Sequence, residues 1–388
     1  MSSKDPKIWH WMALLVMVIL TGGSVITFSN LLDAGYTVIS TSSQSPYLVH
    51  AFDNYRVVAQ NLTQSRCEGV VFSKFKILKE KTYNPKKYKD DGHLLREASQ
   101  ACTPPGTPRI AFLFLVRGHI PHEPLWKRYL QNHEGKYSLY VHAAPGYIYP
   151  KGSLFECKEI PSKPCPRFSP RIVDAHRRLL AQALLDPRYN NAWFVNVCES
   201  TIPIRSFPFA YHYLMTSPVS FVESFYPNAN YHSWNTTPEF NRTDLRKGEL
   251  WMAIRREHAL TVVKDAEIHN KFLRDCKRWC TWDEQYVQTL LHIRDPSGIA
   301  ERTVMYVDWN FPHGGSPKTL EATPHKIRDV QSRTRDMDGE RHDTAFNKTS
   351  YDCVHNGVSP SPCFLFARKF KPEATKPLLA LNPKYLGF

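Results

Sequence analysis

The pattern of hydrophobic and polar residues divides the chain into three regions. Residues 8–32 contain no Asp, Glu, Lys or Arg, and a run of that length can cross a bilayer as a helix. Residues 33–108 are polar and irregular, with Lys-rich and Pro-rich stretches, which predicts a stem. From residue 109 to 388, short apolar runs alternate with helical patterns, which predicts one large folded domain.

The alternating pattern of the third region indicates an α/β domain. RIAFLFLV (109–116), YSLYVHA (137–143) and AWFVNVC (192–198) are predicted strands, whereas EPLWKRYLQNH (123–133) and DAHRRLLAQALL (174–185) are predicted helices. Further strands are predicted at VSFVESF, VMYV and FLFARKF. We expect a single mixed sheet flanked by helices. Ligand sites in such sheets lie at the carboxyl ends of strands, which directs attention to Arg117, His142 and residues 198–200.

The N-terminal apolar run is interpreted as a signal-anchor helix. Trp9 and Trp11 suit a membrane interface, and Lys4 and Lys7 precede the run, so the tail 1–7 is expected in the cytosol and the remainder in the lumen. A cleaved signal peptide is the alternative, but its apolar core would be shorter, and no convincing cleavage site precedes Asp33. The prediction is a type II membrane protein.

Glycosylation signals and cysteines agree with a luminal domain. N-x-S/T signals begin at Asn61, Asn235, Asn241 and Asn347. The nine cysteines allow at most four bridges and leave one thiol, and no pair has the C-x-x-C spacing of zinc sites. We expect Cys198, at the end of an apolar strand, to be the free thiol, and Cys353 to pair with Cys363.

The charge of the chain adds a candidate chemistry. Its 50 Lys and Arg against 36 Asp and Glu give a net charge of +14, which suits phosphates, nucleotides or acidic polymers, although a solvated basic surface is an equal alternative. A nucleic-acid partner is not expected, because the domain faces the lumen and has no basic helix. An anchored, basic, luminal α/β domain suggests a nucleotide-sugar enzyme.

No metal site is predicted. The Asp-x-Asp motif at Asp336–Asp338 has no apolar strand before it and is surrounded by arginines, so we interpret it as a solvated loop. Without a metal, side-chain cations must neutralise the departing diphosphate. FLFARKF supplies Arg368 and Lys369, whose side chains should point to opposite faces of a strand. The spacing alone favours the alternative, in which both are exposed cations at a strand end.

The stretch TWDEQY places two carboxylates at a predicted helix start. Thr281 and Glu284 fit the capping box T-x-x-E, in which the Glu284 side chain accepts a hydrogen bond from the Thr281 amide. The alternative is chemistry, since a helix N-terminus also stabilises and fixes an ionised carboxylate. The spacing alone favours capping.

Five ordered blocks together resemble a known family: FLVRGHIPHEPLW, WFVNVCESTIPIRSF, RKGELWMAIRREHA, WDEQY and FLFARKF. The chain is similar to the plant-type branch of the core-2/I-branching β-1,6-N-acetylglucosaminyltransferases from about residue 109 to the C-terminus. The resemblance implies a GT-A-like fold and a metal-independent, inverting transfer from a UDP-sugar. It also implies that Glu284 is the catalytic base, with Asp283 the residue that serves the helix end, and that Lys369 binds the diphosphate.

The chain departs from the family pattern at two places. Gln285 stands where relatives carry His, and His142 stands where animal members have an aspartate near the nucleotide. Arg117 and Arg368 are further candidates for donor binding, with His142. For the acceptor, an aromatic platform with carboxylates or amides is typical of sugar sites. The candidate residues for it are Glu199, Lys247, Asp308 and Trp309.

Two classes of function therefore stay open. The first is a Golgi glycosyltransferase that transfers N-acetylglucosamine in β linkage, or glucuronic acid or another sugar, from a UDP donor to a glycan. The second is a membrane-anchored carbohydrate-binding protein without turnover, which the departures at Gln285 and His142 favour.

Overall fold

The computed structural model describes residues 88–226, 234–276, 280–309, 316–336 and 351–388. The expected tail 1–7 and membrane helix 8–32, with nearly all of the stem, lie outside these residues. Within the described part, we find no helix with the length and apolar character needed to span a membrane.

The central sheet has four strands in the order β2-β1-β3-β5. Strands β1 (Arg109–Leu115), β2 (Tyr137–His142) and β3 (Asn191–Val197) are parallel, and β5 (Ala253–Arg255) pairs antiparallel with β3. Because parallel sheets are covered on both faces, their strands are nearly continuous apolar runs. This is why the sequence pattern located β1, β2 and β3.

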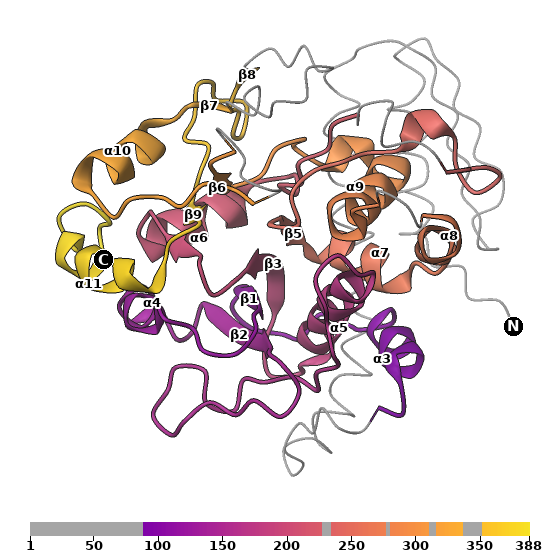
Figure 1. Ribbon diagram of the computed structural model, residues 1–388, viewed down its shortest axis with the longest axis horizontal. Coiled ribbons are helices and arrows are strands. Elements are labelled where there is room, and N and C mark those ends of the chain that lie inside the picture. The colour runs from indigo at the N-terminus through magenta and orange to yellow at the C-terminus, as the bar shows by residue number, and fades with distance from the viewer. Residues whose placement is uncertain (1–87, 227–233, 277–279, 310–315, 337–350) are drawn as a thin grey trace, which may run out of the picture. The chain divides into compact units, whose positions relative to one another are not determined.

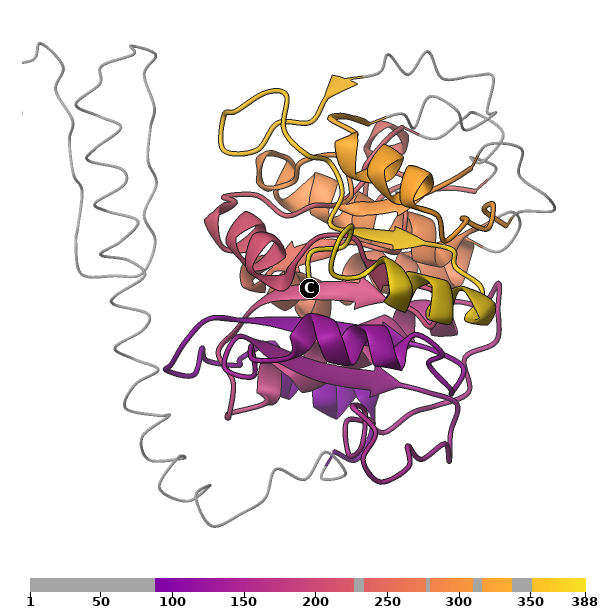
Figure 2. The ribbon, with the colours of Figure 1, turned by 90° about the vertical axis from the view of Figure 1, so that its left-hand side faces the viewer.

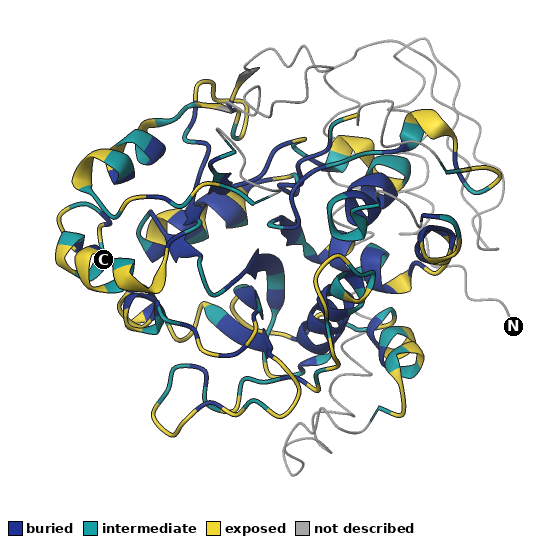
Figure 3. Ribbon diagram, viewed as in Figure 1, coloured by how far each residue is buried: buried dark blue, intermediate teal, exposed yellow. Residues whose placement is uncertain are grey.

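Helices cover both faces of this sheet (Figure 1). On one face lie α3 (Asp91–Ala98), α5 (Arg171–Leu185), α7 (Arg256–Lys264), α8 (Glu267–Asp275) and α9 (Trp282–Arg294). On the other face lie α4 (Glu123–Leu130), α6 (Phe207–Thr216) and α11 (Thr375–Leu381). These three helices lie on the side nearest the viewer in Figure 2. The strands and the inner sides of the helices are buried (Figure 3).

The period-two alternation of β1 divides the core into two clusters. Ala111 and Leu113 point into the cluster with α5, α7 and α9, whereas Ile110, Phe112 and Phe114 point into the cluster with α4 and α6. All five are fully buried. Both faces of this strand are therefore buried.

The expected single sheet is wrong, because three strands form a second sheet with the order β4-β9-β6. Its strands are β4 (Ile202–Pro203), β6 (Met305–Val307) and β9 (Phe366–Arg368). After β3 the chain turns, with the Thr201 amide donating to the Cys198 carbonyl, so β4 leaves the first sheet and pairs with β9 instead. Helix α10 (Pro324–Ser332) packs in the same cluster as these strands.

The remaining short elements stand apart from the two main sheets. Strands β7 (Arg335–Asp336) and β8 (Tyr351–Asp352) pair with each other. Three 3-10 helices are η3 (Arg242–Asp244), η4 (Pro296–Gly298) and η6 (Pro372–Ala374). The predicted strand VSFVESF forms only isolated bridges, at Ser220, Phe221 and Phe225.

Helix α3 shows that the folded unit includes residues upstream of the expected boundary at Arg109. Leu94 and Ala98 are buried in the cluster formed by α5, α7 and α9. Asp90 caps this helix by accepting from the His93 amide. The last part of the expected stem therefore packs on the domain.

The predicted disulfide Cys353–Cys363 is present, and a second bridge joins Cys276 to Cys280. Cys102 is also disulfide-bonded. Cys198 is free and buried as expected. However, the expectation of one free thiol is wrong, because Cys157 and Cys165 are free as well.

Candidate functional site

The carboxyl ends of the strands in both sheets meet at one edge. The amide of Phe370, just after β9, donates to the carbonyl of Ser200, just after β3, at 3.0 Å. The amide of Val116, at the end of β1, donates to the carbonyl of His142, at the end of β2, at 3.1 Å. Residues that follow these strands are therefore held together by main-chain bonds, as expected for ligand sites of α/β sheets.

Glu284 lies in the first turn of α9 but does not form the capping box. Thr281 is the N-cap residue, as predicted, yet its side chain makes no capping hydrogen bond. The Glu284 carboxylate instead pairs with Lys247, with Oε2 3.0 Å from Nζ. The capping interpretation of Glu284 is therefore wrong, because a cation from a distant segment binds this carboxylate.

The segment RKGELW, residues 246–251, connects Glu284 to the cations of the C-terminal motif. Lys247 binds Glu284, and Glu249 accepts a hydrogen bond from the Trp309 indole at 2.7 Å. The Trp251 ring lies under the Arg368 guanidinium, 4.3 Å from the centroid. Carboxylate, aromatic platform and cation thus share one supporting segment.

A close approach of two backbones fixes this segment. A Cβ on Gly248 would lie 2.0 Å from the Glu223 carbonyl oxygen, so only glycine fits there. The Gly248 amide donates to the Glu284 carbonyl at 2.8 Å, and the Glu249 amide donates to Glu223 Oε2 at 2.8 Å. Sequence reasoning missed Glu223, although it is the one charged residue in the apolar run VSFVESF and is fully buried.

The Asp283 carboxyl, next to Glu284 in the first turn of α9, has a raised pKa. Burial and the neighbouring Glu284 carboxylate raise the pKa of Asp283 to about 7, and Glu249 adds to this effect while Lys247 opposes it. Asp283 therefore keeps its proton to a higher pH than an ordinary aspartate does. Two adjacent carboxylates consequently have different environments, which is typical of acid/base sites.

The cations of FLFARKF lie at the same edge. Arg368 is 9% exposed, and its Nε has no hydrogen-bond partner among the described residues. Lys369 Nζ donates to Ser316 Oγ at 2.8 Å. Burial and the nearby cations Arg368 and Arg167 lower the pKa of Lys369, which is the arrangement of a positive cluster built for an anion.

Two residues near Lys369 complete this side of the site. Cys198 and, after it, Glu199 act in the opposite direction to these cations and raise the pKa of Lys369. Arg167, in the loop before α5, was missed by the sequence analysis, because nothing in KPCPRFSPR predicts its proximity to β9. The candidate Arg117 is exposed after β1.

His142 is placed at the end of β2 but is 1% exposed and bound within the fold. Arg178 NH1 lies 2.7 Å from its Nε2, and Arg178 also pairs with Asp91 of α3 at 3.1 Å. Burial and Arg178 lower the pKa of His142 to about 4, so the imidazole is neutral at physiological pH. His142 is therefore a buried residue that supports the end of β2 through its contact with Arg178.

Of the two residues after β6, Trp309 contacts the supporting segment and Asp308 lies beside α10. Trp309 is half-buried and bonded to Glu249. Asp308 is buried and lies 3.7 Å from Lys326 of α10. Asp308 thus contacts the second sheet's helix, whereas Trp309 remains beside the acceptor candidates.

Comparison with known proteins identifies the family of this domain. The family model of the Core-2/I-Branching enzyme matches residues 110–333. Glycosyltransferase BC10 of Oryza sativa subsp. japonica is 31% identical over 326 residues, covering 74% of this chain and 79% of the relative. The chain belongs to the Core-2/I-Branching enzyme family. It is accordingly a glycosyltransferase.

Gln285, which stands where relatives of this Core-2/I-Branching enzyme carry His, does not face Glu284's partner Lys247. Gln285 is fully buried, and its Oε1 lies 3.8 Å from Cys276 Sγ and 3.7 Å from Cys280 Sγ. Glu284 and Gln285 therefore point to different surroundings, one to Lys247 and one to a disulfide. The substitution leaves the polar groups around Glu284 in place.

The described residues of this Core-2/I-Branching enzyme contain no group of three or more His, Cys, Asp or Glu side chains that could hold a metal ion. Asp336 lies in β7, at the pairing with β8, and Asp338 lies outside the described residues. Metal independence stays a prediction. Asn235 and Asn241 are exposed, and Asn61 and Asn347 also lie outside the described part.

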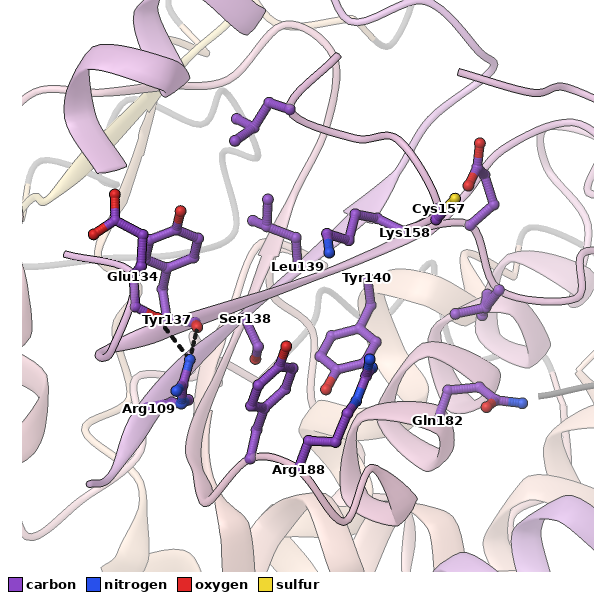
Figure 4. A pocket seen from close by; sticks show the side chains of 14 residues that line it. Arg109, Glu134, Tyr137, Ser138, Leu139, Tyr140, Cys157, Lys158, Gln182 and Arg188 are labelled. Atoms are coloured by element: carbon purple, nitrogen blue, oxygen red, sulfur yellow. Dashed lines mark hydrogen bonds between the residues drawn. The ribbon is translucent and has the colours of Figure 1, made fainter. Parts of the chain in front are cut away.

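A pocket of about 390 Å³ opens elsewhere in this Core-2/I-Branching enzyme, along the outer edge of β2 (Figure 4). Its wall includes Arg109, at the start of β1, which donates to the carbonyls of Glu134 and Tyr137. None of the predicted site residues lines it. Because it lies beside the amino ends of the strands, we do not assign the transfer reaction to it.

Proposed function

We propose that the chain is an inverting, metal-independent glycosyltransferase with a GT-A-like fold, which transfers a sugar from a UDP donor to a glycan. The sugar that the family resemblance favours is N-acetylglucosamine, in β linkage. The observation that carries the proposal is the arrangement of Glu284 and the Arg368–Lys369 pair around the common segment 246–251. A base and an anion site on one support are what this transfer needs.

Glu284 is the base of the proposed reaction. The acceptor hydroxyl gives its proton to the Glu284 carboxylate as its oxygen attacks the anomeric carbon from the face opposite the nucleotide. The bond from the anomeric carbon to the diphosphate oxygen breaks at the same time, so the configuration inverts. The Lys247 ammonium, 3.0 Å from Glu284 Oε2, pairs with this carboxylate and holds it in position.

The cations supply the role that a divalent ion has in other nucleotide-sugar enzymes. The diphosphate gains negative charge as the glycosidic bond breaks, and fixed cations stabilise that charge. Lys369 is held by Ser316, and Arg368 is held on the Trp251 ring. Because both are positioned before the donor binds, little reorganisation accompanies the reaction.

We place this reaction in the Golgi lumen. Residues 8–32 would form a signal-anchor helix, with the tail 1–7 in the cytosol and the stem between helix and domain. Disulfides support an oxidising compartment, and exposed Asn235 and Asn241 are available for glycosylation. Glucuronic acid or xylose as the donor sugar is the alternative within this class.

Purified luminal protein, UDP-sugars and a glycan panel test the proposal. Glu284→Gln should lower kcat by at least about 10³-fold, because the base is lost, while the affinity for UDP stays within about 2-fold. Glu267→Gln is the matched control, since Glu267 pairs with Arg294 on the surface. Activity that persists in Glu284→Gln, or that EDTA removes, contradicts the proposed mechanism. Binding of UDP without turnover in the native protein would favour a carbohydrate-binding role.

A further inference from the structure

Four carboxylates come from the segments that meet at the Glu284–Lys247 ion pair. Asp283 and Glu284 come from the first turn of α9, Glu249 from the supporting segment, and Glu223 from the run before it. Glu223 and Glu249 are 0% and 5% exposed. Among the described residues, Lys247 is the cation that forms an ion pair with Glu284. Removing the Lys247 ammonium therefore leaves Glu284 without this ion pair.

The backbone of Lys247 is fixed on both sides. Its amide donates to the Phe225 carbonyl at 2.8 Å, and the Phe225 amide donates to its carbonyl at 2.9 Å. The next residue, Gly248, donates to the Glu284 carbonyl. The two side chains of the ion pair are 14% and 23% exposed, so water screens them only in part. Lys247 is consequently held against Glu284 before any substrate binds.

The charges that face Glu284 act in opposite directions. Asp283 is repelled by the neighbouring Glu284 and Glu249 carboxylates, whereas the Lys247 ammonium attracts both Asp283 and Glu284. The Cys165 thiol, which interacts with Asp283, has a pKa raised to about 11 and is neutral. The Lys247 ammonium, 3.0 Å from Glu284 Oε2, offsets part of the repulsion among these carboxylates.

We propose that Lys247 is a positioning residue of the transfer reaction, which pairs with the Glu284 carboxylate and holds it in place for the acceptor hydroxyl. This inference rests on the proposed function, because it assigns a role relative to the base. It differs from the sequence-based expectation that Lys247 binds the acceptor. The two roles make different predictions for kinetics.

The test is the pH profile of kcat/KM for Lys247→Met. Loss of the ammonium should move the acid limb of the profile upward by about one pH unit, so that the rate at low pH falls about 10-fold. The rate on the alkaline plateau should stay within about 3-fold. Lys247→Arg should restore the wild-type profile, because a guanidinium also pairs with a carboxylate.

Two further variants make the test specific. Lys127→Met removes the ion pair with Glu123, 2.9 Å long and distant from the site, and should leave the profile unchanged. Asp283→Asn added to Lys247→Met should move the acid limb downward again, because one competing carboxylate is gone. The same downward shift of the acid limb is expected for Asp283→Asn alone. This single variant tests the inference if Lys247→Met fails to fold.

Three results would overturn the inference. An equal loss of rate at every pH would indicate a structural role, and a raised acceptor KM at every pH would indicate acceptor binding. An acid limb that stays in place in both Lys247→Met and Asp283→Asn would exclude the proposed coupling. If native protein is active and Glu284→Gln is not, such a result refutes this inference alone. If Glu284→Gln remains active, the proposed function itself fails.

Discussion

At the scale of single residues, the site separates positive from negative side chains. Lys369 and Arg368 gather where β9 ends, and Glu284 with Asp283 gather at the start of α9. The separation matches a reaction in which one end of the donor leaves as an anion and the acceptor loses a proton at the other end. Substitutions at the two ends should therefore have different effects.

Lys369→Ala should weaken the binding of UDP about 10-fold and the binding of uridine by less than about 2-fold. The reason is that a nearby cation interacts with phosphate charge and not with the nucleoside. Isothermal titration calorimetry with both ligands measures this. Lys371→Ala is a suitable control, because Lys371 is exposed just beyond the motif. Equal losses for UDP and uridine would contradict a diphosphate role.

The lowered pKa of His142 predicts that the domain loses stability in mild acid. Its pKa is about 4 in the fold, below the value near 6.5 of an unfolded chain, so the unfolded state binds more protons between these pH values. The free energy of unfolding therefore falls as pH decreases from about 6.5 toward 4, by up to about 1.4 kcal/mol per unit. Thermal unfolding at several pH values measures the slope.

His142→Asn provides the comparison for that measurement. The amide oxygen of asparagine can still accept from Arg178, but it does not titrate, so the pH dependence should become shallower. An exposed histidine, His119, gives the control as His119→Asn. Identical slopes for wild type and His142→Asn would show that another group carries the acid sensitivity.

The roles of single residues were only partly predictable from sequence. Glu284 fits a capping box, and only the resemblance favoured chemistry, because the cation that binds it is far away in the chain. Glu223 and Glu249 gave no signal beyond a charge next to apolar residues. His142 marks the end of a strand, but its bond to Arg178 depends on how α5 packs.

At the scale of elements, the supporting segment 246–251 depends on Gly248. Gly248→Ala should lower the free energy of unfolding by about 1–3 kcal/mol, since its Cβ would overlap the Glu223 carbonyl. Activity should fall as well, because Lys247 and Glu249 flank the displaced backbone. Gly135→Ala, where a Cβ meets nothing within 4 Å, should change neither quantity. Chemical denaturation and a transfer assay on both variants test this.

The disulfide Cys353–Cys363 is a second local constraint, on the segment that precedes β9. Replacing both cysteines by alanine should lower the free energy of unfolding by about 2–3 kcal/mol, as expected for closing a loop of this length. Cys157→Ser should have little effect, because Cys157 is a free, exposed thiol. Urea unfolding compares the two variants. A loss in Cys157→Ser as large as in the double variant would contradict this expectation.

The pattern of hydrophobic residues predicted the elements of the first sheet well and those of the second sheet poorly. Strands β1 to β3 are long apolar runs, buried on both faces, so the sequence alone marks them. The second sheet pairs strands of two or three residues from distant parts of the chain. Such short strands have no periodicity to detect, and their pairing depends on the tertiary fold.

At the scale of the whole described domain, α3 joins the expected stem to the core. Leu94→Ala should lower the free energy of unfolding by about 2–4 kcal/mol, because Leu94 is 4% exposed in the cluster with α5 and α7. Leu95→Ala, on the same helix but only half-buried, should cost less than half as much. Equal losses for the two variants would show that α3 contributes through its presence as a helix and not through packing.

The position of β9 also determines when the protein can become active during its synthesis. β9 lies between β4 and β6 in the second sheet, yet it is synthesised after both of them. While residues 366–369 remain inside the ribosome, the earlier strands have no central partner and the donor cations are missing. A polypeptide released prematurely before this point would carry Glu284 and Lys247 but would have no means to retain the nucleotide.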